Sequence, residues 1–443
     1  MKFINNNSFF TVSFNPNVRF YNDDFSYVFA SQSNLYRVYN IPNTIKSMYS
    51  TFYNCTRLNQ NIQIPYGVEN LERTFQKCIN LNQNIQIPNS AEYMYGIFYG
   101  CTNFNQPIYI NGNVYNMGAA FSGCSNLNQH IDITCGGTIE NMAQMCRGCN
   151  NLNSPINIIA NYISNMDEAF QCCNLNSSIN ITVNSYIYSI ENMCSHMPNF
   201  NSSVNITTAK TIYYMNNAFN GCSNFNNSIN ITANNIYNMD NTFYGCYNFN
   251  QPLNIFVKNI GSMNYTFAGC SNLNQPININ NVDNMDFTFQ ACDNFNSPVC
   301  INRTISMLGT FQNCYNFNQN IQLPNSVKYM NGAFMCCNNL NQNIFIPNSV
   351  IDLSYAFNGN NMHLSNITID AYDLRYFNGM IGRSDYVDRS NRINVYIRSG
   401  SPTNARFWNG GQQNNLGRFK WTLDRPNSCY YNTYYNIYIY YTL

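Results

Sequence analysis

The sequence has very little charge, and this scarcity excludes several classes of protein. Only 9% of the 443 residues are Asp, Glu, Lys or Arg, and the net charge is +1. No overall field therefore points to nucleic acid or to another highly charged partner. No run of 18 apolar residues occurs, which predicts that no helix spans a membrane. The opening residues, MKFINNNSFFTVSFNPN, lack the continuous apolar region of a signal peptide.

Asparagine and aromatic residues are abundant instead. The chain contains 89 Asn, 35 Tyr and 31 Phe, against 3 His and 2 Trp. A polar chain with few charges can be disordered, but a hydrophobic content of 45% argues for a folded core. The 19 Cys are spread along a long chain, so they do not indicate the disulfide scaffold of a small secreted domain.

One motif, Phe-x-x-Cys, recurs along most of the chain. Its copies are 22 to 25 residues apart, and about fifteen units cover roughly residues 25–369. A unit consists of Met-x-x-x-Phe-x-x-Cys-x-Asn-Leu/Phe-Asn-Gln-x-Ile-x-Ile and then a variable stretch. Cys146 and Cys194 replace the Phe in two of the units. Aligning the units on this motif gives columns of equivalent residues.

The columns predict the fold. Ile-x-Ile alternates with period two and predicts a short strand whose apolar residues point inward. Phe-x-x-Cys spans about one helical turn and predicts a short helical or 3₁₀ turn with both side chains facing the core. Such a unit cannot bury its apolar face alone, so the units must stack, with their strands paired in parallel. We therefore predict a β-rich repeat solenoid with a short strand and a short helical turn in each repeat.

A column of asparagines comes directly after the Leu or Phe of thirteen units. We expect these side chains to form a buried structural ladder, in which each amide bonds the backbone or amide of the adjacent turn. The column contains Asn59, Asn82, Asn105, Asn128, Asn153, Asn176, Asn201, Asn226, Asn250, Asn274, Asn296, Asn318 and Asn341.

The repeats resemble a known family. The segment Ser326–Val350, with Ala333-Phe334 and Cys337, resembles the BspA-like leucine-rich repeat, whose pattern is roughly I-x-x-x-A-F-x-x-C-x-x-L-x-x-I-x-I-P-x-S-V. Residues 249–253, FNQPL, are similar to the Asn-rich repeats of mycoplasma-type surface proteins. The resemblance implies a leucine-rich-repeat solenoid. It also implies one of several settings, because the family includes bacterial and protist surface adhesins and proteins encoded by tailed phages.

Both ends depart from the repeat and predict the domain organisation. Residues 1–24 are expected to cap the first turn, and residues 25–369 to form the solenoid. After about residue 370 the composition changes: nine of the 21 Lys and Arg and both Trp lie in residues 370–443. We interpret this region as a small β-rich domain that caps the solenoid or attaches it to an assembly.

The sequence offers little for catalysis. Cys146-Arg147-Gly148-Cys149 has the spacing of redox and zinc sites, but both cysteines occupy repeat columns, which explains the spacing. The histidines are scattered, and no nucleophile triad or phosphate loop is visible. We expect no enzyme, no catalytic residue, no metal and no cofactor. The cysteine column predicts buried free thiols, which favour folding in a reducing compartment.

The middle residue of Ile-x-Ile is the candidate for ligand binding. Solenoids bind partners on extended faces, and uncharged amides with interspersed Tyr suit glycans or polar proteins. A solvated face, lateral packing in an oligomer, or ladder stability alone would also account for these residues. The candidate face contains Gln63, Gln86, Tyr109, Asp132, Asn157, Asn180, Asn205, Asn230, Asn254, Asn278, Gln322 and Phe345.

The sequence therefore favours a structural and binding protein. We expect a component of a virus particle, a tailed-bacteriophage fibre, tail or capsid-decoration protein, assembled in the cytoplasm of a bacterial host. Its expected partners are other virion proteins at its ends and a host surface glycan or protein, with a homo-oligomer as a further option and neither nucleic acid nor membrane insertion. The alternatives are a bacterial or protist cell-surface adhesin and an intracellular protein-interaction scaffold.

Overall fold

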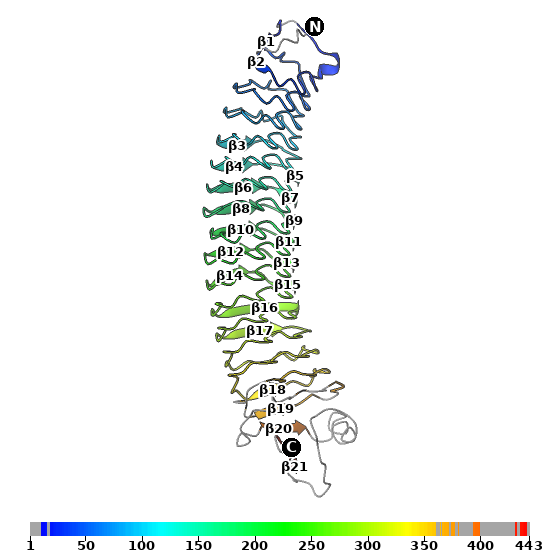
Figure 1. Ribbon diagram of the computed structural model, residues 1–443. Helices are drawn as coiled ribbons and strands as arrows, with labels where there is room; N and C mark the ends of the chain where they lie inside the picture. The colour runs from blue at the N-terminus through cyan, green and yellow to red at the C-terminus, as the bar shows by residue number, and fades with distance from the viewer. Residues whose placement is uncertain are drawn as a thin grey trace. The chain divides into compact units, whose positions relative to one another are not determined.

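The computed structural model describes residues 10–15, 18–359, 364, 366–371, 374–376 and 380, and the backbone of 393–398, 430–431 and 435–440. The chain forms a β-solenoid in which each repeat makes one turn (Figure 1). It divides into two compact units, Met1–Asn235 with Asn254–Phe256, and Ile236–Leu253 with Val257–Leu443. Within the described residues, no helix is long and apolar enough to cross a bilayer.

From residue 108 onward, the first unit contributes strands to two parallel sheets. The first sheet has the order β14-β12-β10-β8-β6-β4-β3 and the second includes β11-β9-β7-β5. The first-sheet strands are β3 (Ile108–Asn111), β4 (Ile131–Thr134), β6 (Ile156–Ala160), β8 (Ile179–Val183), β10 (Val204–Thr208), β12 (Ile229–Thr232) and β14 (Leu253–Phe256). The second-sheet strands are β5 (Thr138–Asn141), β7 (Tyr162–Asn165), β9 (Ile187–Ser189) and β11 (Thr211–Tyr214).

The N-terminal residues of this unit add a small parallel pair. Strand β1 (Phe10–Ser13) pairs with β2 (Leu35–Tyr39), and a short 3₁₀ segment, η1 (Tyr21–Asp23), lies between them in the chain. Phe14 packs edge-on against Phe25, 5.3 Å between ring centroids. The assignment of residues 1–24 as a cap stays a prediction.

The second unit repeats the pattern. Strands β13 (Asn235–Asn238), β15 (Asn259–Ser262), β16 (Ile277–Asn284) and β17 (Val299–Arg303) lie next to one another in one sheet. A five-stranded sheet has the order β18-β19-β20-β22-β21, formed by β18 (Ile344–Ile346), β19 (Asn366–Ile369), β20 (Ile393–Arg398), β21 (Tyr430–Tyr431) and β22 (Tyr435–Tyr440). Most of the predicted C-terminal domain, 370–443, lies outside the described residues, and its boundary stays a prediction.

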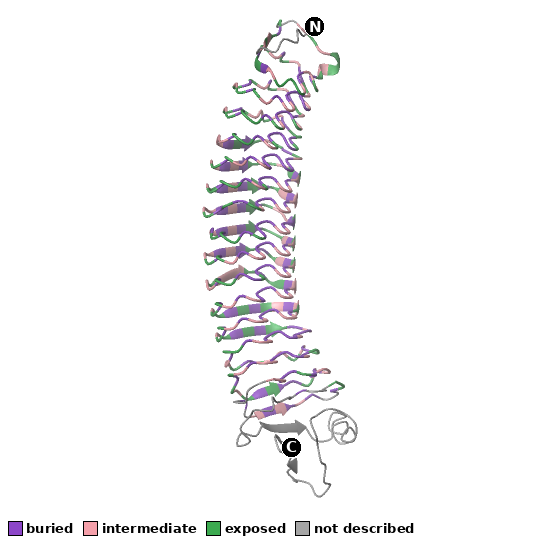
Figure 2. Cartoon of the chain, in the orientation of Figure 1, coloured by how far each residue is buried: buried purple, intermediate pink, exposed green. Residues whose placement is uncertain are grey.

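The core of each turn is built by the predicted columns. In β3, Ile108 and Ile110 are buried while Tyr109 between them is exposed, and in β4, β6 and β8 the residue between the two buried Ile is half-buried (Figure 2). Where successive turns hold Phe in this column, the rings lie nearly parallel: the ring centroids of Phe52 and Phe75 are 5.4 Å apart, and the two rings are tilted by only 6°. The predicted solenoid, with its strands and inward-facing Phe and Cys, is thus confirmed.

The Phe-x-x-Cys segment is not helical, however. Across residues 48–55, alternate N–H groups donate to carbonyls of the next turn at 2.7–2.9 Å, and the N–H groups between them donate three residues back at 3.0–3.1 Å. The residue before each column Cys has a positive φ, as in Asn54 (φ 58°), Lys77 (φ 61°) and Gly100 (φ 69°). A helix cannot contain a left-handed residue every fourth position, so the expected helical turn is replaced by a series of tight turns that bond to both neighbours.

Candidate functional site

The predicted binding face on the first sheet is a ladder of amides. The Nδ2 of Asn157 donates to Asp132 Oδ1 at 2.7 Å, and Asn180, Asn205, Asn230 and Asn254 each donate to the residue one turn before at 2.7–2.9 Å. Each amide therefore uses one N–H within the ladder, and each oxygen up to Asn230 accepts one hydrogen bond. The ladder explains the composition of this column and leaves half of its hydrogen-bonding capacity facing outward.

The other residues predicted for this face are more dispersed. Gln63 and Gln86 bond locally to the asparagines two residues earlier, at 3.3 and 2.9 Å. Tyr109 is exposed and hydrogen-bonded to His130. Asn278, Gln322 and Phe345 are also exposed, but they belong to the second unit. Within the first unit, the hydrogen bonds join the residues from Asp132 to Asn254 on one surface.

The thirteen-residue asparagine column lies at the surface rather than in the core. Its members are exposed or half-buried, because each comes directly after the buried Leu or Phe on the approach to the strand and points outward. The hydrogen bonds nevertheless form a ladder: the backbone N–H of Asn82 donates to Asn59 Oδ1 at 3.0 Å, and that of Asn105 donates to Asn82 Oδ1 at 2.9 Å. The expectation of burial is wrong. The column is instead an ordered row of accessible amides, which we call the inner row.

A second row of asparagines, two residues before the first, runs parallel to it. In this outer row, Asn103 Nδ2 donates to Asn80 Oδ1 and Asn126 Nδ2 donates to Asn103 Oδ1, each at 3.3 Å. The same contact recurs in the second unit, from Asn272 to Asn248 at 3.1 Å and from Asn294 to Asn272 at 3.3 Å. One turn before Asn80, this position is held by Arg57 instead of Asn.

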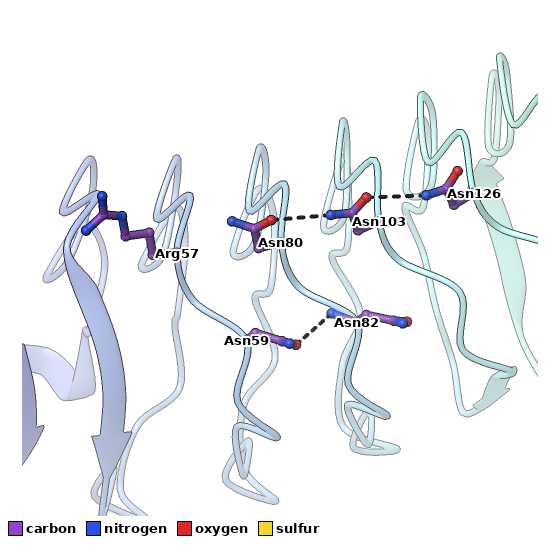
Figure 3. Close-up of a pocket in the computed structure, with 6 residues that line it drawn as sticks. All are labelled: Arg57, Asn59, Asn80, Asn82, Asn103 and Asn126. Atoms are coloured by element: carbon purple, nitrogen blue, oxygen red, sulfur yellow. Dashed lines mark hydrogen bonds between the residues drawn. The ribbon is translucent and has the colours of Figure 1, made fainter. Parts of the chain in front are cut away.

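A groove lies between the two rows in the first unit. It has a volume of about 690 Å³ and is lined by Arg57, Asn59, Asn80, Asn82, Asn103 and Asn126. Figure 3 shows Asn80, Asn103 and Asn126 in one row, with Arg57 at its head, and Asn59 and Asn82 in the other. No acidic side chain is among these lining residues. The groove can bind a polar ligand through hydrogen-bond donors and a single positive charge.

Sequence reasoning missed the groove, although both rows are in the repeat motif. Two features of the sequence indicate the groove. An asparagine stands two residues before the inner row in every unit from Asn80 to Asn126, and Arg57 takes this position one repeat earlier. A groove needs both rows to be accessible. The expectation that the inner row is buried removed it from consideration as a binding surface.

The cysteine column is a buried row of free thiols. Eleven of the column Sγ atoms donate to the carbonyl of the Phe-column residue one turn before, as Cys78 does to Phe52 at 3.0 Å, and these contacts span 2.9–3.1 Å. The described cysteines form no disulfide. Burial raises the pKa of Cys55 and of Cys222 to about 12. These two thiols are therefore protonated and act as small hydrogen-bonding core residues.

The remaining chemistry is sparse within the described residues. No group of three or more His, Cys, Asp or Glu has the geometry to hold a metal ion there. His130 lies 3.9 Å from Asp132 on the exposed sheet face, while His196 occupies a left-handed turn position with φ 56°. His363 lies outside the described residues. The histidines that can be placed therefore do not share a site.

Comparison with known proteins identifies the family. No protein with a curated description matches the chain. Among solved structures, the chain is similar to a leucine-rich repeat protein from Bacteroides ovatus, with 20% identity, 88% of this chain and 87% of that chain covered, and a TM-score of 0.43. The family model described as "Mycoplasma protein of unknown function, DUF285" matches residues 23–133, 109–207, 164–278, 188–301, 213–324 and 305–384. These overlapping matches confirm the resemblance drawn from the repeats, and the chain belongs to this DUF285 family of repeat proteins.

Proposed function

We propose that this protein is a non-enzymatic binding protein that contacts a glycan or glycoprotein surface through its asparagine-lined groove. The observation that carries the proposal is the groove itself, an open concave surface lined by five asparagines and one arginine. Sugar hydroxyls both donate and accept hydrogen bonds, as amides do. Amides that are held in place by ladder bonds bind such a ligand with little loss of side-chain entropy.

The experiment is a glycan-array screen of the full-length protein, with Arg57→Gln as a matched variant of the groove. We expect wild-type protein to bind a subset of glycans, and the variant to lose or weaken that subset without a change in its circular dichroism spectrum. Absence of binding to any glycan, together with no binding to host cells, would refute the proposed function.

The setting that we propose is a virus particle, as a fibre, tail or decoration protein of a tailed bacteriophage that contacts its host surface. The buried thiol column supports assembly in a reducing bacterial cytoplasm. The ends of the chain would contact other virion proteins. Mass spectrometry of purified virions tests this setting. Recovery of the protein from a cell envelope and not from particles would instead favour a cell-surface adhesin with the same groove.

A further inference from the structure

We propose that a strip of exposed tyrosine and glutamate on the second-sheet side of the first unit binds a basic segment of a partner protein, a segment in polyproline II conformation with Lys or Arg three positions apart. We call this surface the tyrosine strip, and its residues are Glu92, Tyr93, Tyr115 and Glu140. The inference goes beyond the proposed function, because the strip shares no residue with the asparagine-lined groove.

The strip follows one outward-facing column over three consecutive turns. The backbone N–H of Tyr115 donates to Glu92 O, and that of Glu140 donates to Tyr115 O, each at 2.8 Å. All three side chains are exposed, while the residue that precedes each of them is buried. Tyr93 follows Glu92 in the chain, and its ring centroid lies 5.9 Å from that of Tyr115. Tyr115 therefore lies between two carboxylates, with a second exposed ring beside it.

The chain itself does not neutralise these two carboxylates. Across the described residues, Glu92 and Glu140 take part in no ion pair and in no side-chain hydrogen bond. Glu69, in the same column one turn before Glu92, is different, because it is paired with Lys46. Two unpaired carboxylates beside exposed aromatic rings form a locally negative surface, and a cationic side chain complements both the carboxylates and the ring faces.

Two contacts within the first unit show how a cation binds on this side. On the turn before the strip, the carboxylate of Glu69 accepts a hydrogen bond from Lys46 Nζ at 2.7 Å. Close by in the chain, the guanidinium of Arg73 lies 5.7 Å from the ring centroid of Tyr95. The first contact is an ion pair between adjacent turns, and the second is a cation–π contact. A partner's Lys or Arg would make the same two interactions with the carboxylates and rings of the strip.

The spacing of the two carboxylates favours one conformation of the partner. Glu92 and Glu140 belong to turns two steps apart, which places them roughly 9.4–9.8 Å from each other at the strand spacing of a parallel sheet. Polyproline II has three residues per turn and a rise of about 3.1 Å, so residues i and i+3 lie on one side, about 9.3 Å apart. In a β-strand these two residues point to opposite sides. The residues between the two cations would pack on Tyr115, since segments of this conformation bind to aromatic surfaces.

The experiment measures the binding of dye-labelled peptides to the full-length protein by fluorescence anisotropy. Three peptides of equal length carry the cores Lys-Pro-Pro-Lys, Lys-Lys-Pro-Pro and Gln-Pro-Pro-Gln. We expect the first to bind about tenfold more tightly than the third, because it gains two ion pairs and an exposed cation–π contact. The second should bind more weakly than the first, because adjacent lysines cannot reach both carboxylates. The advantage of the first should shrink between about 0.01 M and about 1 M salt.

Matched variants locate the binding. Glu92→Gln and Glu140→Gln each remove one carboxylate of the strip, and Asp132→Asn removes the same charge from the first sheet. Tyr115→Leu removes a ring of the strip, whereas Tyr66→Leu removes a ring outside it that is 93% exposed. We expect each variant in the strip to weaken the binding of the Lys-Pro-Pro-Lys peptide about threefold to tenfold. The two controls should leave the binding unchanged.

Four outcomes overturn the inference. Equal losses in Asp132→Asn and in the glutamate variants of the strip would assign the binding to net charge. Equal affinity for the two lysine peptides would remove the selected spacing and conformation. Equal affinity for the glutamine peptide would make the strip an aromatic surface for uncharged partners, and binding of no peptide would remove the site. Thermal unfolding of every variant, measured in parallel, separates lost binding from lost folding. Each of these outcomes leaves the proposed function of the groove in place.

Discussion

The hydrogen bonds of the inner asparagine row predict that the amide oxygen of each side chain stabilises the fold and that its amide N–H groups do not. In the second unit, Asn274 Oδ1 accepts the backbone N–H of Asn296 at 2.9 Å and the hydroxyl of Ser297 at 3.0 Å. The Nδ2 of the same amide has no part in these contacts. Asn274→Ala removes the acceptor, whereas Asn274→Asp keeps an oxygen in the same place and removes only the N–H groups. The two variants should therefore differ in stability.

The magnitude is set by the contacts. The alanine variant leaves the Asn296 N–H without its acceptor, while Ser297 keeps a bond to the Asn274 carbonyl at 2.9 Å. One net hydrogen bond is worth about 1 kcal/mol, and water can replace part of it because the row is exposed. We expect a loss of up to about 1 kcal/mol, or roughly a fivefold change in a local opening equilibrium. The aspartate variant should lose nothing, since a carboxylate accepts more strongly than an amide.

Hydrogen exchange measures this directly. The N–H of Asn296, monitored by mass spectrometry with fragmentation to single residues, should exchange about fivefold faster in Asn274→Ala and no faster in Asn274→Asp. Exchange several turns away should not change in either variant, because each turn bonds only to its neighbours. Equal acceleration in both variants, or none in the alanine variant, would refute the role that we assign to the Oδ1 atom.

Four further predictions test the core. Phe289→Ala, which removes a fully buried ring from the stack, should lower the free energy of unfolding by about 3–5 kcal/mol in chemical denaturation. Thr288→Val keeps the shape of the side chain but removes a hydroxyl whose single hydrogen is shared between two carbonyls at 2.7 and 3.0 Å, and should cost about 1 kcal/mol in the same assay. Thiols that ionise near pH 9 when unfolded stay protonated in the folded chain, where the pKa of Cys55 and of Cys222 is about 12. Folding stability should therefore fall as pH rises above about 9, by up to about 1.4 kcal/mol per pH unit for each such thiol. Alkylation of the native protein at pH 8 should label the exposed Cys172 and Cys300 and spare the buried column, and labelling of the column would contradict this interpretation.

The sequence was sufficient to predict the parts of the fold that depend on burial. Phe and Cys at a fixed spacing, and Ile on alternate positions, must face inward wherever the units stack, whatever the conformation of the backbone between them. The backbone conformation itself could not be predicted from the motif. The left-handed position before the column cysteine holds Gly in some turns but Asn54, Lys77 or Ala291 in others, so stacking enforces a conformation that the local residues do not favour.

The candidate site was harder to predict because it depends on accessibility. The ladder bonds of the inner row are a consequence of the repeat, since identical amides one turn apart must meet. Whether these side chains are buried does not follow from the repeat, because an asparagine beside a buried Leu or Phe can point either inward or outward. The groove requires two rows and the Arg57 side chain at their head, and these residues are separated by one to three repeats in the sequence.

The scarcity of charge and the abundance of asparagine have one physical cause. In a stack of near-identical turns, each surface residue lies about 4.8 Å from its own equivalents above and below. A charged residue in such a column would face like charges on both sides, at a cost of about 1 kcal/mol per pair in water at this distance and several times more near a protein surface. An amide both donates and accepts, so it can bond to copies of itself without limit. Arg57 is placed where this rule permits a charge, at the head of a row whose next members are Asn80, Asn103 and Asn126. Arg57 carries the single positive charge among the residues that line the groove, and its removal therefore tests whether this surface binds a ligand through that charge.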